Sequence, residues 1–227
     1  MVNLIAVGFL FLSLAAPPSE LERARDRQDM PALQALTAKL ADDAGKSPND
    51  AGAQYRLALA DSYLAEVAQE LGDKAAVQKA AEAGIVVAQR AVALQGNVAE
   101  HHRILGTLCG QAVPAGVMLA VKYAQCASTS IHKAIELDPK SSLAYVGQGV
   151  GNYYLPAAFG GGVELAIRDF QKAVQLNPKS SEAYLWLGIA SRKAGRNAEA
   201  RAALQTAVNL DPERVWARKQ LEKTPAK

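Results

Sequence analysis

Three consecutive glycines are the stretch of this 227-residue sequence that most resembles a site for chemistry. Gly160, Gly161 and Gly162 precede a segment with helical spacing of its apolar residues, and a glycine-rich loop before a helix can bind phosphate. A phosphate-binding loop needs Gly-Lys-Ser/Thr after its glycines and a strand before them. Here Val163 and Glu164 follow, and a helical pattern precedes. The glycines therefore predict an enlarged turn rather than a phosphate site.

This turn is expected to join two helices. Pro156 ends the first helical pattern, and the glycines allow positive φ before the second helix begins. Phe159 is expected to anchor the turn in an apolar site. The turn either packs on a longer neighbouring hairpin or lines a partner site.

No constellation of side chains predicts catalysis or a bound metal. His101 and His102 are adjacent in the sequence, so they point to different faces of a helix and cannot chelate one metal ion from one face. His132 stands apart from both. The sequence has no Gly-x-Ser-x-Gly motif and no cysteine with a supporting histidine in register. We therefore expect no enzyme, no cofactor and no metal.

The two cysteines, Cys109 and Cys126, fall in one predicted helical hairpin. With a turn at Pro114, residue 120 lies opposite Cys109 and leaves Cys126 about 9 Å further along at 1.5 Å per residue. A turn nearer Met118 brings the cysteines together. The sequence leaves two alternatives, a disulfide in an exported protein and a pair of buried thiols.

The composition favours an all-α protein. The sequence is 50% hydrophobic, 6% aromatic and 21% charged, with a net charge of +3. Alanine-rich sequence with Leu, Gln, Glu, Lys and Arg favours helix, and no long Val/Ile/Thr alternation predicts a strand. The charge is too small and too evenly spread to indicate a nucleic-acid-binding protein.

The N-terminal segment differs from the rest. Residues 4–16, LIAVGFLFLSLAA, form an apolar run of 13 residues that two prolines follow. A membrane span needs about 20 residues, whereas a shorter run is typical of a secretory signal. We expect a signal peptide over 1–16, cleaved near Ser13, Leu14 and Ala15, and a periplasmic or secreted mature chain. Because no Lys or Arg precedes the run, an uncleaved N-terminal membrane anchor and a cytosolic protein stay open as alternatives.

Three segments end alike, with Ala, a β-branched residue, Leu and an Asp/Asn-Pro pair. They are HKAIELDPKSS at 132–142, QKAVQLNPKSS at 171–181 and QTAVNLDPERV at 205–215. The segment 89–99 has the same form, with Gly96 in place of proline, and GKSPNDAGAQY before it is a degraded version. Proline ends a helix because its ring clashes with the preceding turn and it lacks an N–H. Each segment therefore marks the end of a repeating helical unit.

The clearest unit, 181–212, resembles the tetratricopeptide repeat, a helix–turn–helix of 34 residues. The matching residues are Tyr184 in the first aromatic slot, the pair Leu187 and Gly188, Gly195 at the turn, and Ala200, Leu204, Ala207 and Pro212 in the second helix. Ser191 stands where the family usually has Tyr. The resemblance implies an all-α, right-handed α-solenoid of helical hairpins.

Successive endings lie further apart toward the N-terminus. The distance is 34 residues from Pro178 to Pro212, 39 from Pro139 to Pro178, 43 from Gly96 to Pro139, and 48 from Pro48 to Gly96. Because the endings stay alike, the extra residues must lengthen the paired helices, and 50–73 and 74–94 are each long enough for such a helix. The predicted hairpins are 19–48, 50–96, 98–139, 141–178 and 180–212, in one repeat domain over 19–227.

The segment 213–223 predicts a helix that caps the last repeat, as terminal repeats of a solenoid require. Val215, Trp216 and Leu221 are expected to cover that repeat. The basic residues are expected to face water, and they are Arg214, Arg218, Lys219 and Lys223.

Residues 99–212 also resemble two other families in their layout of elongated, partly disguised repeats. These are the T component of periplasmic TRAP-type transport systems and the eukaryotic regulators of microtubule dynamics. The first resemblance implies a component that presents a small apolar ligand to a transporter. No cysteine closely follows the apolar run, so the lipid attachment of a bacterial T component is not expected.

In tetratricopeptide proteins one stripe of each first helix packs within the repeat, and a second stripe lines a concave groove. We assign Tyr184, Leu187, Gly188 and Ser191 to the packing stripe. The predicted groove residues are apolar or aromatic with a basic edge, and they are Val146, Val150, Tyr153, Tyr154, Leu185, Ile189, Arg192 and Lys193. The Lys/Asn clamp with which some family members grip a C-terminal carboxylate is not expected, because aliphatic residues hold those positions.

These observations predict an exported protein-interaction scaffold that binds a peptide or helix in an apolar concave groove. Another protein is the expected partner, without nucleic acid and without stable membrane insertion of the mature chain. Two alternatives stay open. One is a periplasmic transport-associated component that presents a small apolar ligand, and the other is a structural protein whose groove is filled by the long N-terminal hairpins.

Overall fold

The computed structural model describes residues 19–113 and 117–226, apart from the side chains of 117–122. This described part contains eleven α-helices and no β-strand, so the all-α prediction is confirmed. The helices are α1 (Glu20–Asp26), α2 (Met30–Lys46), α3 (Ala51–Leu71), α4 (Lys74–Leu94), α5 (Ala99–Ala112), α6 (Val117–Leu137), α7 (Ser142–Tyr154), α8 (Val163–Leu176), α9 (Ser181–Lys193), α10 (Asn197–Leu210) and α11 (Val215–Glu222). A short 3₁₀ turn, η2 (Ala157–Phe159), lies between α7 and α8.

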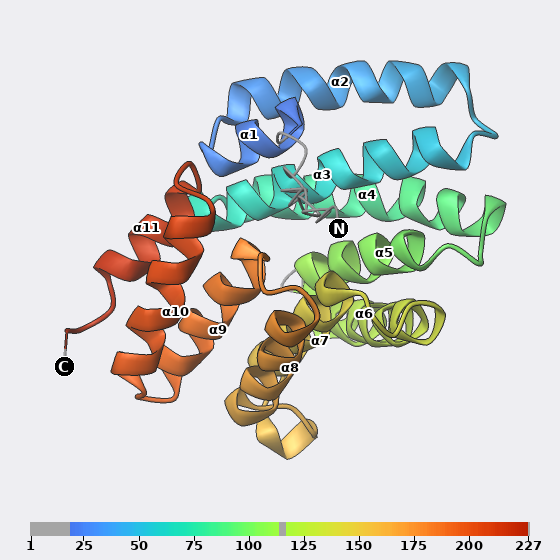
Figure 1. Ribbon diagram of the computed structural model, residues 1–227. Helices are drawn as coiled ribbons and strands as arrows, with labels where there is room; N and C mark the ends of the chain where they lie inside the picture. The colour runs from blue at the N-terminus through green and yellow to red at the C-terminus, as the bar shows by residue number, and fades with distance from the viewer. Residues whose placement is uncertain (1–18, 114–116, 227) are drawn as a thin grey trace, which may run out of the picture.

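Consecutive helices pair as hairpins, and the hairpins stack side by side into a solenoid (Figure 1). The pairs are α1–α2, α3–α4, α5–α6, α7–α8 and α9–α10, and α11 packs on the last pair. Helices α3, α4 and α6 have 21 residues each, whereas α7 to α10 have 13 or 14. The predicted solenoid with longer hairpins toward the N-terminus is confirmed.

The Asp/Asn-Pro-Lys-Ser endings stop one helix and start the next. The side chains of Asp138 and Asn177 each accept a hydrogen bond from a backbone N–H two residues on, which tightens the turn. Ser141 and Ser180 then cap α7 and α9, because their hydroxyls accept from the N–H groups three residues later. The repeated motif thus encodes a complete helix–helix junction.

Close packing inside the last hairpin depends on Gly188. A Cβ atom at this position of α9 would lie 2.5 Å from Leu204 Cγ and 3.0 Å from the carbonyl oxygen of Ala200, both on α10. No side chain fits there without moving the second helix. The predicted role of the Leu-Gly pair is therefore confirmed, as is the turn at Gly195, whose φ is +77°.

The apolar core of the described residues is a series of clusters between sequence neighbours. One cluster joins α3 to α6, another joins α7 to α9, a third joins α9 to α11, and a fourth joins α1 to α3. None of these clusters connects α1 or α3 to α11. Nevertheless α11 lies beside the N-terminal helices in space (Figure 1), so other forces must hold these ends together.

The cysteines form a disulfide, so the alternative of two buried thiols is wrong. The Cα atoms of Cys109 on α5 and Cys126 on α6 are 5.9 Å apart. Helix α5 ends three residues after Cys109, whereas α6 begins nine residues before Cys126. The first turns of α6 therefore extend beyond the end of α5, an offset that a symmetric hairpin does not have. This offset places residue 126, rather than residue 120, opposite Cys109.

Within the described residues, no helix is both long enough and apolar enough to cross a membrane. The expected signal peptide at 1–16 lies outside the described residues.

Candidate functional site

The two ends of the solenoid meet at Arg214, the residue that precedes α11. Its guanidinium donates hydrogen bonds to Glu70 at 3.1 and 2.5 Å and to Glu66 at 2.5 Å, and both carboxylates belong to α3. Its Nε lies 3.7 Å from Asp26, the last residue of α1, and 3.9 Å from Glu182 on α9. The Arg214 side chain is only 2% exposed. We call these five residues the Arg214 cluster.

The prediction that Arg214 faces water is wrong. When the helix wheel of α11 is extended back by one residue, Arg214 falls on its polar side. That side faces α1 and α3 rather than solvent. Two neighbouring contacts strengthen the junction: Arg27 pairs with Glu213 at 2.8 Å, and Lys219 donates to Gln28 at 2.6 Å. All these contacts are polar, which explains why no apolar cluster joins the ends.

The carboxylates of the Arg214 cluster outnumber the guanidinium groups that pair with them. Arg25 also pairs with Asp26, at 2.6 Å, so two guanidiniums face the four carboxylates of the cluster. Burial raises the pKa of Glu66 to about 7, against the opposing effect of Arg214 and with help from Glu182. Burial by itself lowers the pKa of Arg214. The surrounding carboxylates together have the larger effect and hold that pKa above its ordinary value.

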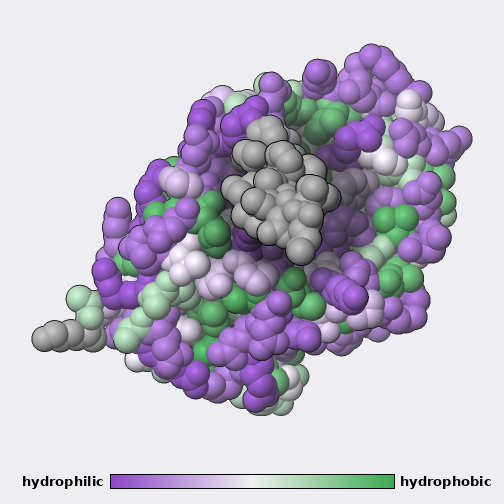
Figure 2. Space-filling model, in the orientation of Figure 1, coloured by the Kyte–Doolittle hydropathy of each residue, from purple (hydrophilic) through white to green (hydrophobic). Residues whose placement is uncertain are grey.

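A pocket of ≈ 270 Å³ lies next to this cluster on the concave side. It is formed by α3, the end of α7, α9 and α11, which are distant in the sequence. In Figure 2, hydrophilic side chains make up most of the coloured surface of this face, with hydrophobic ones scattered among them. The pocket is lined by Glu66, Gln69, Glu70, Tyr153, Tyr154, Glu182, Trp186, Ile189, Arg192, Arg214, Trp216, Gln220 and Lys223.

Three aromatic rings form adjacent walls of the pocket. The ring centroids of Tyr153 and Tyr154 are 5.0 Å apart, with planes at 88°. Trp186 stands 6.0 Å from Tyr153 at 69° and 6.5 Å from Tyr154 at 74°. Glu182 accepts from the indole N–H of Trp186 at 2.9 Å, and Gln69 of α3 donates to the Tyr154 hydroxyl at 3.2 Å. The rings are therefore held at nearly right angles to one another.

Four of the predicted groove residues line this pocket: Tyr153, Tyr154, Ile189 and Arg192. Tyr154 is 58% exposed, whereas Ile189 is only 6% exposed. Lys193 lies at the rim, where its Nζ is 4.0 Å from the Tyr153 ring centroid. These predicted residues therefore lie together around one pocket, and their role in binding stays a prediction.

Three other predicted groove residues, Val146, Val150 and Leu185, pack in apolar clusters and do not line the pocket. Val146 and Val150 pack with Phe170 of α8 in the cluster between α7 and α9. Leu185 is 1% exposed and packs, with Ile189, against Leu204 and the capping helix α11. The capping helix α11 covers the face of α9 that carries Leu185, whereas Val146 and Val150 meet α8 within their own hairpin.

Sequence comparison finds the same repeat. Residues 163–221 match the family model of the tetratricopeptide repeat. These residues therefore form a tetratricopeptide repeat. A thermophilic tetratricopeptide repeat protein of Thermus thermophilus has the same fold, with a TM-score of 0.64 and 17% identity over 90% of this chain and 98% of that one. No curated protein matches the chain in sequence.

The structure of MamA from Desulfovibrio magneticus RS-1, residues 41 to the end, is also similar to that of this chain. The similarity has a TM-score of 0.46 and 17% identity, over 88% of this chain and 99% of that one.

The pocket residues that sequence analysis missed fall into two groups. Glu182, Trp186 and Ile189 follow one another on α9 at spacings of four and three, so they share one helical face and a stripe drawn through Ile189 along that face includes all three. Glu66 and Glu70 gave no such signal, because an acidic side chain at the end of a long helix is normally solvated. Only closure of the solenoid brings α3 to the pocket.

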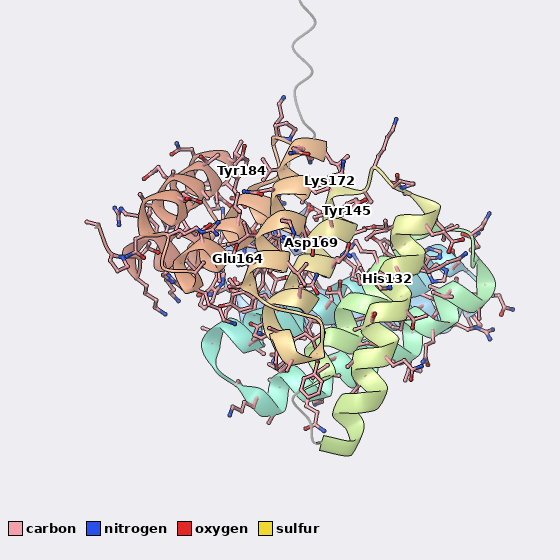
Figure 3. The ribbon with its side chains drawn as sticks, turned by 90° about the horizontal axis from the view of Figure 1, so that it is seen from below. His132, Tyr145, Glu164, Asp169, Lys172 and Tyr184 are labelled. Atoms are coloured by element: carbon pink, nitrogen blue, oxygen red, sulfur yellow. A yellow bond between two sulfur atoms is a disulfide. The ribbon has the colours of Figure 1, made fainter. Side chains whose placement is uncertain are left out.

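The glycine turn between α7 and α8 does not hold a buried anchor. Gly160 and Gly162 have φ of +87° and +119°, as expected for a turn that only glycine enters easily. A Cβ at Gly161 would lie 2.2 Å from the carbonyl oxygen of Leu155. Phe159, however, is 75% exposed, so its predicted burial is wrong. Glu164, labelled in Figure 3, follows the turn on α8. Its carboxylate pairs with Arg196 at 2.7 Å.

Each of the three histidines interacts with a nearby group of the chain. His101 and His102 contact the carbonyl oxygens of Gln95 and Gly96, at 3.2 and 2.8 Å, and so stabilise the end of α4. His132 on α6 lies near Asp169 on α8, in the region labelled in Figure 3, and favours the ionised form of that carboxyl. Burial nevertheless raises the pKa of Asp169 overall.

Proposed function

We propose that this protein is an interaction module whose concave pocket receives a short segment of a partner protein. Stacked helical repeats create concave surfaces suited to binding other proteins. The observation that supports a partner site is the exposed aromatic wall, since Tyr154 is 58% exposed in a hollow beside Trp186. Tyr and Trp dominate the residues that contribute most to protein–protein binding.

The proposed partner segment is small. Sites that enclose drug-sized ligands have volumes of about 300–1,000 Å³, and this pocket measures ≈ 270 Å³. That volume accommodates one or two side chains, whereas a whole helix needs an open groove. The proposed contact is therefore a side chain inserted from a peptide or loop that crosses the rim, and we propose no catalytic activity.

We also propose that the protein is exported. The apolar run at 4–16 supports this, and the Cys109–Cys126 disulfide supports it independently, because disulfides persist mainly in oxidising compartments. Expression in a bacterial host followed by N-terminal sequencing tests the proposal. We expect a mature chain that lacks about the first 15 residues. A chain that keeps Met1 and stays in the cytosol contradicts it.

The alternative of a carrier for a small apolar ligand has less support. The pocket is open, and six of its lining residues are charged: Glu66, Glu70, Glu182, Arg192, Arg214 and Lys223. An apolar ligand would have to desolvate these groups without compensation.

Partner capture with pocket variants tests the interaction proposal. Tyr154→Ala should weaken partner binding about tenfold, since 1.4 kcal/mol corresponds to a factor of ten. Its exposure means that folding should hardly change. Phe159→Ala is the matched control, because it removes an exposed aromatic side chain outside the pocket in the same hairpin. Equal binding by both variants and the wild type places the partner site elsewhere.

A further inference from the structure

The pocket combines aromatic faces with three carboxylates, those of Glu66, Glu70 and Glu182, which share the guanidinium of Arg214. Tyr153, Tyr154 and Trp186 stand at 69–88° to one another, and Trp216 lines the same pocket from α11. Faces of aromatic rings attract cations through their quadrupoles, and several rings around one site reinforce the effect. The geometry is therefore that of a cage for a positively charged group.

The protein already uses these rings in this way at the rim. Lys193 Nζ lies 4.0 Å from the centroid of Tyr153, and Lys223 Nζ lies 5.5 Å from the centroid of Trp216. Both lysines are exposed at the surface. Tyr154 and Trp186, in contrast, have no cation stacked on their rings among the described residues.

The charges around the cage favour a cation. Glu182 lies at the edge of Trp186, and Glu66 and Glu70 face it from α3. Arg214 is the cation nearest to these carboxylates, and with Arg25 it balances only two of the four acidic groups of the Arg214 cluster. One positive group in the pocket reduces this imbalance.

Two other cations line the pocket, Arg192 and Lys223, and both are directed to other groups. Lys223 lies over the Trp216 ring. Arg192 donates to the carbonyl oxygen of Gln220 at 3.0 Å, to its side-chain oxygen at 2.5 Å, and to the Thr224 hydroxyl at 3.2 Å. Its guanidinium is thus directed to the C-terminal end of α11. The acidic side of the pocket and the Arg192 side are separate.

We propose that the pocket binds the cationic side chain, lysine or arginine, of a partner segment. The alkyl stem lies against Ile189 and the rings, and the ammonium or guanidinium group approaches Glu66 and Glu182. This inference rests on the proposed function, because the partner protein supplies the lysine or arginine. The preference of the pocket for a cation can nevertheless be tested without a partner.

Binding should strengthen as the pH rises. Glu66 faces Arg214, Glu182, Arg25 and Glu70, and its pKa is about 7. Below that pH its carboxyl group is protonated and does not attract a cation, whereas above it the carboxylate does. Affinity for a cationic probe should therefore increase between pH 6 and pH 8, with release of a proton on binding at about pH 7.

Tryptophan fluorescence reports on this pocket alone, because the chain has only two tryptophans and both line it. The probes are N-acetyl-arginine methylamide and N-acetyl-lysine methylamide, and the neutral controls are the citrulline and norleucine analogues. We expect saturable fluorescence changes with the cationic probes, at millimolar concentration, and at least about fivefold weaker binding of the neutral ones.

Two variants separate the ring contribution from the charge contribution. Tyr154→Leu keeps an apolar wall but removes a ring, and Glu66→Gln removes a carboxylate and should abolish the pH dependence. Each should weaken cationic probes about fivefold or more. The controls are Phe159→Leu, an exposed ring outside the pocket, and Glu164→Gln, an exposed carboxylate outside it.

The outcomes are distinct. Equal binding of charged and neutral probes, or binding only of an anion such as N-acetylglutamate, overturns the cation site. Partner binding that needs Tyr154 but survives replacement of every Lys and Arg in the partner segment also overturns it and leaves the proposed function intact. Probe binding with partner capture insensitive to Tyr154→Ala removes the proposed function and retains a site for free amines.

Discussion

Arg214, just before α11, donates hydrogen bonds to both carboxylate oxygens of Glu70 near the end of α3, although 144 positions separate the two residues. A guanidinium and a carboxylate in this two-bond arrangement make one of the stronger polar contacts in proteins. Here it joins the last helix of the solenoid to its second hairpin. The contact turns an open array of repeats into a closed ring with a pocket inside.

Replacement of Arg214 by methionine should destabilise the protein strongly. The variant leaves the carboxylates of Glu66 and Glu70 without their buried partner, and such a loss typically costs about 3–5 kcal/mol. Since Glu66 can become protonated, we expect the lower end of that range. Urea unfolding at pH 7.5 measures the change, and small-angle scattering should show an expanded molecule. Arg27→Met is the control, because its ion pair with Glu213 is exposed. Equal stability of the two variants contradicts a closing role for Arg214.

Alanine at the glycine turn should destabilise the protein at two positions. Gly160 and Gly162 have positive φ, and a residue with a Cβ in that region costs roughly 1–2 kcal/mol. Gly151→Ala is the control, because a Cβ there meets nothing within 4 Å and α7 is helical at that position, so this variant should be neutral or more stable. Thermal unfolding compares the three variants. Calorimetry with ATP should show no binding to any of them, and saturable micromolar binding contradicts our interpretation of the turn.

Asp61 should make the protein less stable as the pH rises. This residue of α3 is 6% exposed, and burial raises its pKa to about 7. The native state therefore holds a proton that the unfolded state releases at about pH 4. The corresponding stability is fully present below pH 4 and is lost as the pH rises toward 7, by up to about 4 kcal/mol at 1.36 kcal/mol per pKa unit.

Asp61→Asn removes this titration. Urea unfolding at pH 5 and pH 8 should show a smaller difference for the variant than for the wild type, with the variant more stable at pH 8. Asp42→Asn is the control, since Asp42 is exposed on α2. An identical pH profile for the wild type and Asp61→Asn shows that Asp61 is solvated in the native protein.

Reduction of the Cys109–Cys126 disulfide should lower the melting temperature. The bridge closes a loop with a sequence separation of 17, and a loop of about 15 residues corresponds to roughly 3 kcal/mol in the chain-entropy description. Calorimetry with and without a phosphine reductant measures the difference. The variant with alanine at both positions should melt like the reduced protein and ignore the reductant. Two thiols that react with a thiol reagent in the unreduced native protein contradict the bridge.

The sequence alone determined the helical hairpins, because their signals are local. Proline after Asp or Asn ends a helix wherever it occurs, and serine before the next apolar run begins one. The missing side chain of Gly188 leaves room for Leu204 on the facing helix of the same hairpin. The spacing of these two residues in the repeat therefore also predicted their contact. Proline, serine and glycine at these positions affect only neighbours within one repeat. A repeat is short enough for its pattern to be recognised in the sequence.

Tertiary structure decided which faces of these helices are covered. Leu185 and Trp186 are adjacent and both apolar, and nothing in the pattern of α9 tells which of them meets α11 and which lines the pocket. The offset that joins Cys109 to Cys126 is equally invisible, since it depends on how far α6 extends beyond α5. Burial of Arg214 depends on more still, because the small rotations between successive hairpins add up until α11 reaches α3. That sum is a property of the whole stack, and no single repeat encodes it.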